Sequence, residues 1–227
     1  MHSRSIDDGF FEPTAIAIGD SPSLKTRNYD GQFSLNKFNE IATLDYGYEI
    51  GGYQHFEVAS FTGSVQLEVR YSEGFWALGF NYSDGPFTFA SGLTNAFRVE
   101  TFEVSQTGVT EAFLIQGGLR WTTVRLLTPG TVTFSKVGFR ASISTVGVGS
   151  LPGSFECSNN VYNEIWKLGA RAATAACVDN GTQPSTWEVS DSGTTMQGQL
   201  FAYSSLSDGF ANYTLTFDSK ILRGGTG

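Results

Sequence analysis

The amino-acid sequence predicts an all-β protein whose main part is an antiparallel β-sandwich. Aromatic residues make up 14% of the 227 residues and charged residues only 16%, a composition that favours strands over helices. Short runs of alternating apolar and polar residues extend from Ala15 to Ser144, as expected for strands with one buried face. Gly, Asn, Asp and Pro separate these runs at intervals typical of antiparallel sandwiches.

The clearest strand pattern lies at residues 64–71, where every second side chain from Val65 to Tyr71 is apolar. Similar patterns predict strands at residues 43–50, 54–60, 97–104, 111–116, 121–128 and 131–139. In the last of these the alternation changes phase between Phe134 and Val137, which indicates a β-bulge. Residues 83–86 (SDGP) and 128–130 (TPG) are turn-forming sequences between strands.

A single helix is predicted at residues 155–180, with Ser158, Asn159 or Asn160 as its N-cap. Its apolar residues recur at helical spacing, so we expect this face to dock on the sandwich. Any apolar surface that stays uncovered would favour self-association. The apolar face comprises Tyr162, Ile165, Trp166, Gly169, Ala172, Ala173 and Ala176.

The segments around the helix differ in character. Residues 145–154 have small side chains and no periodic pattern, so we expect a linker. This segment contains Gly147-x-Gly149, but it lacks the other residues of a nucleotide-binding loop. After the helix, strand patterns return, but they are too few for an independent core, and we expect the natural protein to continue past Gly227. These patterns lie at residues 186–189 and 194–201, around a turn at 190–193, and at Tyr213, Leu215 and Phe217.

The expected domain organisation is therefore a tail (1–14), a β-sandwich domain (15–144), a linker (145–154), a helix (155–180) and a partial second β domain (181–227).

Charge and hydropathy exclude two classes of partner. A net charge of −8 argues against nucleic acid, because binding a polyanion requires a surface rich in Lys and Arg. No apolar stretch approaches the 18 or so residues that a membrane-spanning helix needs. The N-terminus lacks the apolar core of a signal peptide, whereas three N-glycosylation sequons agree with an extracellular protein. The sequons begin at Asn81, Asn180 and Asn212.

The sequence contains no catalytic or metal-binding motif that we can defend, and it predicts no cofactor. The only histidines are His2 in the terminal tail and His55 on a predicted strand surface. Cys157 and Cys177 bracket the helix, so we expect two free thiols rather than a disulfide, unless the helix breaks into a hairpin. Among the acids, Glu49 with Glu57 and Glu188 with Asp191 are conceivable glycosidase pairs, but acids beside turns are more often turn formers.

Sugar binding makes a smaller demand on the sequence: an exposed aromatic ring and a few polar groups beside it. Trp76, Tyr82 and Trp121 are candidates because they lie near predicted turns, with Asp84 and Asn81 close by in the sequence. The alternative is that these rings belong to the core, where Trp and Tyr of sandwiches are more often found.

Several stretches resemble the fungal members of glycoside hydrolase family 78, the α-L-rhamnosidases. Residues 45–53 (DYGYEIGGY) and 65–74 (VQLEVRYSEG) are similar to the opening of the family's sandwich. Residues 116–121 (QGGLRW) and 131–139 (TVTFSKVGF) are similar to its closing strands. Residues 155–160 (FECSNN) and 163–166 (NEIW) with Gly169 resemble the helix that leaves the sandwich.

The last segment, from Ser185 to Gly227, resembles the beginning of a concanavalin-like domain that fungal members carry. The resemblance implies a jelly-roll or concanavalin-like sandwich in front of an (α/α)₆ barrel that holds the general acid and general base. No barrel sequence is present in the chain, so no catalytic residue can be assigned to a position here.

These observations leave three hypotheses. The first is a non-catalytic sandwich region whose partner is the catalytic domain of the same parent chain, in an enzyme that acts on rhamnose-containing glycans or glycosides. The second is an autonomous carbohydrate-binding module. The third is a compact lyase or hydrolase with an acid pair, which predicts a carboxyl group of strongly raised pKa in a cleft.

Overall fold

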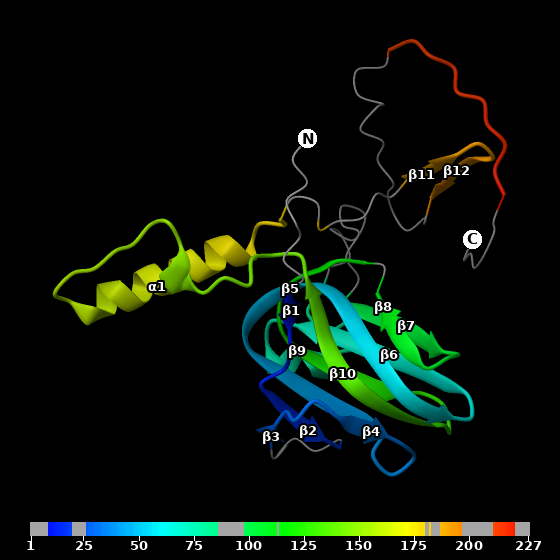
Figure 1. Ribbon diagram of the computed structural model, residues 1–227, viewed down its shortest axis with the longest axis horizontal. Helices are drawn as coiled ribbons and strands as arrows, with labels where there is room; N and C mark the ends of the chain where they lie inside the picture. Colours follow the sequence, from blue (N-terminus) through cyan, green and yellow to red (C-terminus); the bar gives the residue numbers. More distant parts are fainter. Residues whose placement is uncertain are drawn as a thin grey trace. The chain divides into compact units, whose positions relative to one another are not determined.

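The computed structural model describes residues 9–19, 26–85, 98–112, 114–179, 182, 187–196 and 211–220 (Figure 1). The chain forms two compact units, Met1–Pro184 and Ser185–Gly227. The first unit contains the sandwich and the helix, and the second contains a β-hairpin. All strand pairs between named strands are antiparallel, as the sequence predicts.

The pairing of the strands gives two layers that share one long strand, β5 (Ile41–Thr62). In one layer the order is β3 (Arg27–Asn28), β2 (Ala15–Ile18), the first part of β5, β9 (Gln116–Leu126), β6 (Val65–Ser72) and β7 (Val99–Val104). In the other, β10 (Thr131–Ala141) lies between the second part of β5 and two short strands, β4 (Phe33–Leu35) and β1 (Phe10–Phe11). Strand β8 (Gly108–Glu111) pairs with the outer side of β5 in that second layer.

Strand β5 passes from one layer to the other because its middle is rich in glycine. Ile41–Asp45 pairs with β9, whereas Gly52–Thr62 pairs with β10, and the register shifts on both sides of Ile50. Gly47 adopts a φ of 82°, a left-handed conformation that L side chains rarely adopt. The prediction of two separate strands at residues 43–50 and 54–60 was therefore wrong: they are one continuous, bent strand.

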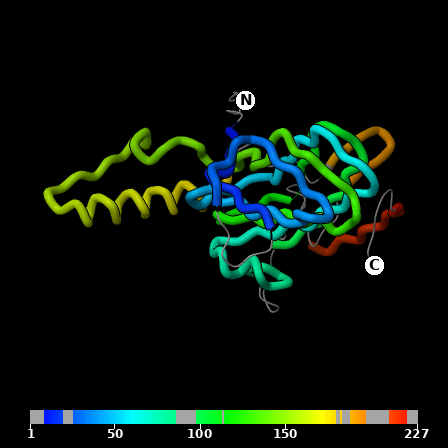
Figure 2. The backbone as a smooth tube through the Cα atoms, turned by 90° about the horizontal axis from the view of Figure 1, so that it is seen from below, coloured from blue at the N-terminus to red at the C-terminus, as the bar shows by residue number. Residues whose placement is uncertain are grey.

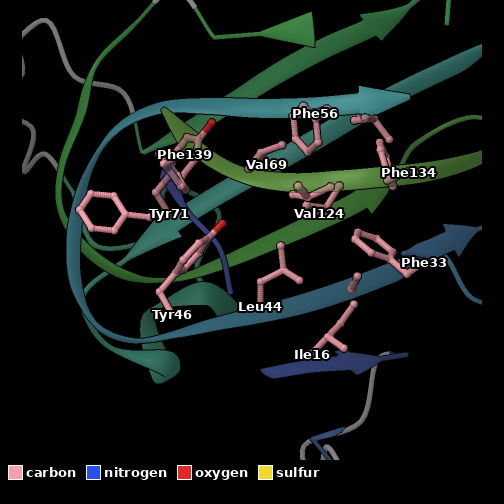
Figure 3. Close-up of a cluster of buried hydrophobic side chains, with 14 of the residues drawn as sticks. Ile16, Phe33, Leu44, Tyr46, Phe56, Val69, Tyr71, Val124, Phe134 and Phe139 are labelled. Carbon is pink, nitrogen blue, oxygen red and sulfur yellow. The ribbon is translucent and has the colours of Figure 1, made fainter. Parts of the chain in front are cut away.

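The core lies between the two layers and contains a cluster of aromatic rings among aliphatic side chains (Figure 3). Tyr46, Phe56, Tyr71, Phe134 and Phe139 are all at most 1% exposed. Phe139 of β10 contacts both tyrosines edge to face, with ring centroids 5.4 Å from Tyr46 and 6.0 Å from Tyr71. These contacts join side chains from β5, β6 and β10, so the aromatic cluster connects the two layers.

Other strand predictions had mixed outcomes. The strand predicted at residues 64–71 is confirmed as β6, and register shifts on both sides of Phe134 confirm the predicted bulge. The strand predicted at residues 111–116 was wrong, because Glu111 ends β8 and Gln116 begins β9. In addition, Phe10 and Phe11 pair with β10, so the sheet includes residues before Ala15.

The predicted helix is present as α1 (Asn160–Ala175), and Asn159 is its N-cap: the Asn159 side chain accepts a hydrogen bond from the Val161 N–H at 3.0 Å. Its docking is limited to the C-terminal end, where Ala175 is buried against the core and Arg171 lies over the Tyr48 ring.

The prediction that the whole apolar face of α1 packs on the sandwich was therefore wrong. Tyr162 and Ile165 are each 57% exposed, and Leu168 is 70% exposed. The physical reason is that the two layers already cover each other's apolar faces, so the sandwich leaves little apolar surface for a helix.

The second unit contains β11 (Trp187–Ser190) and β12 (Gly193–Met196), which pair as a hairpin and confirm the predicted turn. Residues 211–220 form no strand, so the alternation of Tyr213, Leu215 and Phe217 did not indicate one. The rest of the strand predicted at residues 194–201 lies outside the described residues.

Candidate functional site

Four exposed aromatic side chains lie in the turn that follows β6; Phe75 contacts Trp121, and the other three contact one another. The turn contains the short 3₁₀ helix η1 (Phe75–Gly79), which stands out from the strand layers (Figure 2). Trp76 is 73% exposed, Phe80 43% and Tyr82 59%. The ring of Phe80 lies between the other two, with its centroid 5.4 Å from Trp76 and 5.8 Å from Tyr82. We call Trp76, Phe80 and Tyr82 the aromatic surface.

Hydrogen bonds from β6 fix the backbone of this turn. Arg70, which is paired with Glu68, donates from Nη1 to the carbonyl oxygens of Leu78 at 3.1 Å and Phe80 at 3.0 Å. The hydroxyl of the fully buried Ser83 donates to the carbonyl oxygen of Tyr71. The aromatic surface is therefore attached to a rigid part of the sheet.

Asp84 belongs to the same framework of hydrogen bonds that holds the turn. Its Oδ1 accepts a hydrogen bond from Arg98 Nε at 2.7 Å, and its Oδ2 accepts one from the Glu73 N–H at 2.7 Å. Arg98 also donates to the carbonyl oxygens of Gly117 and Gly118, each at 2.9 Å. Because both oxygens of Asp84 already accept hydrogen bonds, this residue positions the turn that carries the rings.

Trp121 lies in β9 rather than near a turn, and it is half-buried. Its ring contacts Phe75 edge to face at 5.2 Å, and the guanidinium of Arg120 lies over it at 5.0 Å. The structure thus brings Trp76 and Tyr82 together through Phe80, while Trp121 contacts the residue that begins η1. Sequence reasoning missed Phe80, although three aromatic residues within seven positions were a usable signal.

A second group of polar residues lies inside the sandwich, around Glu100 of β7. Glu100 Oε2 accepts a hydrogen bond from the Tyr71 hydroxyl at 2.7 Å and another from Gln116 Nε2 at 3.4 Å. Burial raises the pKa of Glu100 from 4.5 to about 6. Its hydrogen-bond partners are a phenol and an amide, so Glu100 does not form the carboxylate pair that most glycosidases use.

Of the other acids considered from the sequence, Glu49 has a neighbouring carboxylate, that of Glu73. Glu49 lies in the bend of β5, whereas Glu57 lies opposite Lys136 of β10 in the second layer. Burial raises the pKa of Glu73, and the neighbouring carboxylates of Glu49 and Asp84 raise it further. Glu188 and Asp191 belong to the hairpin of the second unit, with Asp191 at its turn.

In the described part of the chain, no group of three or more His, Cys, Asp or Glu residues could hold a metal ion. Cys157 and Cys177 are both free. His55 contacts the ring of Phe10 and lies 3.4 Å from Glu111, which Arg140 also binds. No helix among the described residues is long and apolar enough to cross a membrane.

Comparison with known proteins identifies similar structures but no similar sequences. No protein-family model and no curated protein matches the chain. A rhamnosidase from Klebsiella oxytoca, solved with rhamnose bound, is similar with a TM-score of 0.56 and 11% sequence identity. A family 78 rhamnosidase of Bacillus sp. GL1 has a TM-score of 0.46 and 17% identity, over 70% of this chain and 17% of that chain.

The similarity to the Klebsiella enzyme covers 79% of this chain but only 37% of that chain. At this sequence identity it shows a shared fold. The chain thus spans little more than a third of the enzyme that it resembles.

Proposed function

We propose that this chain is the non-catalytic β-sandwich region of an α-L-rhamnosidase-like glycoside hydrolase. Its role is to support the catalytic domain of the same protein during hydrolysis of terminal α-L-rhamnosides. The observation that carries this proposal is the similarity in fold to the Klebsiella rhamnosidase, which covers most of this chain and a minor part of that one. The remainder of such an enzyme is large enough for a separate catalytic domain.

The described residues support a non-catalytic role. Glu100, whose pKa burial raises to about 6, is bonded to a buried phenol and a buried amide. Asp84 and Arg98 form an ion pair that holds a turn in place. The resemblance of residues 45–53, 65–74, 116–121 and 131–139 to the fungal family agrees with the same role.

We also propose that the parent protein acts outside the cell. The support is that Asn212, which begins one of the three N-glycosylation sequons, is exposed.

An antibody raised against the 227-residue chain tests the proposal in extracts and culture medium of the source organism. We expect the antibody to detect a polypeptide much larger than 24.6 kDa and to remove activity on an aryl α-L-rhamnoside by immunodepletion. Pre-immune antibody is the matched control. A band at the size of the isolated chain, with full rhamnosidase activity left in solution, would contradict the proposal.

A further inference from the structure

We propose that the aromatic surface of Trp76, Phe80 and Tyr82 is a binding site for neutral oligosaccharides, which it contacts through the apolar faces of their pyranose rings. This inference goes beyond the proposed function and does not rest on it, because it concerns binding by this chain alone.

The exposure of the rings is the first argument. A single exposed aromatic residue is ordinary, but here three adjacent rings are between 43% and 73% exposed. Phe80 and Tyr82 are nearly parallel, with an angle of 16° between their planes, whereas Trp76 is turned by 81° from Phe80. The surface therefore presents rings in two orientations, on which successive rings of an oligosaccharide can stack.

The rigidity of the turn is the second argument. The hydrogen bonds of Arg70 to the Leu78 and Phe80 carbonyls hold the main chain between the first and second rings. Ser83 and Asp84 hold the main chain immediately after the third ring. A preorganised site loses less conformational entropy when it binds, which matters most for weak ligands such as sugars.

The charge of the surroundings indicates a neutral ligand. The two cationic side chains that support the turn are both neutralised, Arg70 by Glu68 at 2.7 Å and Arg98 by Asp84 at 2.7 Å. They are also largely buried, with 14% and 11% of their side-chain surfaces exposed. Neither is therefore placed to attract a uronic acid or a sulfated sugar, and the net charge of −8 opposes anionic ligands further.

Polar groups suited to sugar hydroxyls lie on the same turn. Asn81, between Phe80 and Tyr82, is exposed, and its amide offers both donors and an acceptor. Tyr82 itself carries a phenolic hydroxyl on a side chain that is 59% exposed. Apolar and aromatic faces with a few adjacent hydrogen-bonding groups are the usual composition of a small-ligand site.

The test is calorimetric titration of the full 227-residue chain with xylohexaose, cellohexaose and the rhamnoside naringin, and with polygalacturonate as an anionic control. The protein is produced in bacteria, because a glycan attached at Asn81 would cover the same surface. We expect binding to at least one neutral probe, and no binding to polygalacturonate. The Trp76→Ala and Tyr82→Ala variants should each weaken binding by about 2- to 10-fold, the usual contribution of one aromatic contact.

The matched control is Phe38→Ala, which removes a ring that is 81% exposed in another part of the sandwich. It should bind the sugar as the wild type does, and all three variants should keep the wild-type melting temperature. Two results would overturn the proposal: no heat of binding with any neutral probe, or binding that is unchanged in both ring variants. A dimer that Trp76→Ala dissociates in light scattering would also overturn it, since the surface would then be an interface between copies of the chain.

Discussion

The hydroxyl group of Tyr71 donates a hydrogen bond to the carboxylate of Glu100 across strands β6 and β7, at 2.7 Å. Tyr71 is completely buried, and its ring also packs on Phe139 in the aromatic core. A titratable group is therefore connected directly to the packing of the sandwich. Because burial raises the pKa of Glu100 to about 6, the protonation of one side chain affects the stability of the fold within an ordinary range of pH.

The first prediction concerns that pH dependence. A carboxyl group whose pKa is raised in the folded state stabilises the fold fully below its unfolded pKa, and this contribution is lost as pH rises through the folded pKa. For Glu100 the window lies between 4.5 and about 6. We expect Glu100 to lower the free energy of unfolding by about 2 kcal/mol between pH 4 and pH 7.

Urea denaturation of the wild type and of Glu100→Gln at several pH values measures this contribution as a difference. Glu100→Gln should remove the corresponding part of the pH dependence, because Gln has no proton to lose. Glu103→Gln, which changes an exposed carboxylate on the same strand, should keep the wild-type profile. Identical pH profiles for the wild type and Glu100→Gln would show that Glu100 is not coupled to folding.

The second prediction concerns the bend of β5. A Cβ atom at Gly52 would collide with the carbonyl group of Arg140 on β10, and main-chain atoms cannot move aside as a flexible side chain can. We expect Gly52→Ala to lower the free energy of unfolding by more than about 2 kcal/mol. Gly117→Ala is the control, because nothing lies within 4 Å of the added atom. Equal stabilities of the two variants would mean that β5 and β10 do not approach as closely as described.

The third prediction concerns the turn that carries the aromatic surface. Asp84→Ala leaves the mostly buried Arg98 without its ion-pair partner and the Glu73 N–H without an acceptor. We expect a loss of about 1–3 kcal/mol in stability and a change in the fluorescence of Trp76. Asp30→Ala breaks an ion pair with Arg27 in which both side chains are largely exposed, and it should have no measurable effect. A wild-type melting temperature for Asp84→Ala would argue against this framework.

The fourth prediction concerns α1. Its first two turns are mostly exposed, so their amides should exchange hydrogen faster than those of β6 or β9, whose apolar residues are buried in the core. Asn159→Ala removes the N-cap hydrogen bond and should speed exchange in these turns by about 5-fold. Exchange in β6 should not change. Equal protection of α1 and β6 would mean that the apolar face of the helix is covered in solution, for example by self-association.

Much of the sandwich could be predicted because its strands have one buried face. Strand β6 alternates strictly, so its limits were predicted to within one residue. The continuity of β5 could not be predicted, because its glycines indicate a turn just as well as a bend in a long strand. The strand predicted at residues 111–116 is absent because Ala112 and Leu114 belong to a connecting segment. Both are nevertheless buried, and their spacing imitates the alternation of a strand.

The candidate site was predictable only in part. The sequence indicated Trp76 and Tyr82 by their type and by their closeness to turn residues, and both are exposed. It could not show that Trp121 is half-buried against Phe75 or that Asp84 is bonded to Arg98, because both contacts join different strands or turns. The exposed stripe of α1 was also unpredictable, since periodicity shows that a helix has an apolar face but not what covers it.

The central claim, that this chain supports catalysis without performing it, is tested most directly by its own rate of hydrolysis. The purified 227-residue chain is assayed on an aryl α-L-rhamnoside beside a known α-L-rhamnosidase, and Glu100→Gln and Glu73→Gln are assayed in parallel. We predict no turnover above the rate of the buffer for the wild type or either variant. Turnover by the wild type that one of these carboxylate substitutions abolishes would contradict the account and place an active site in the sandwich itself.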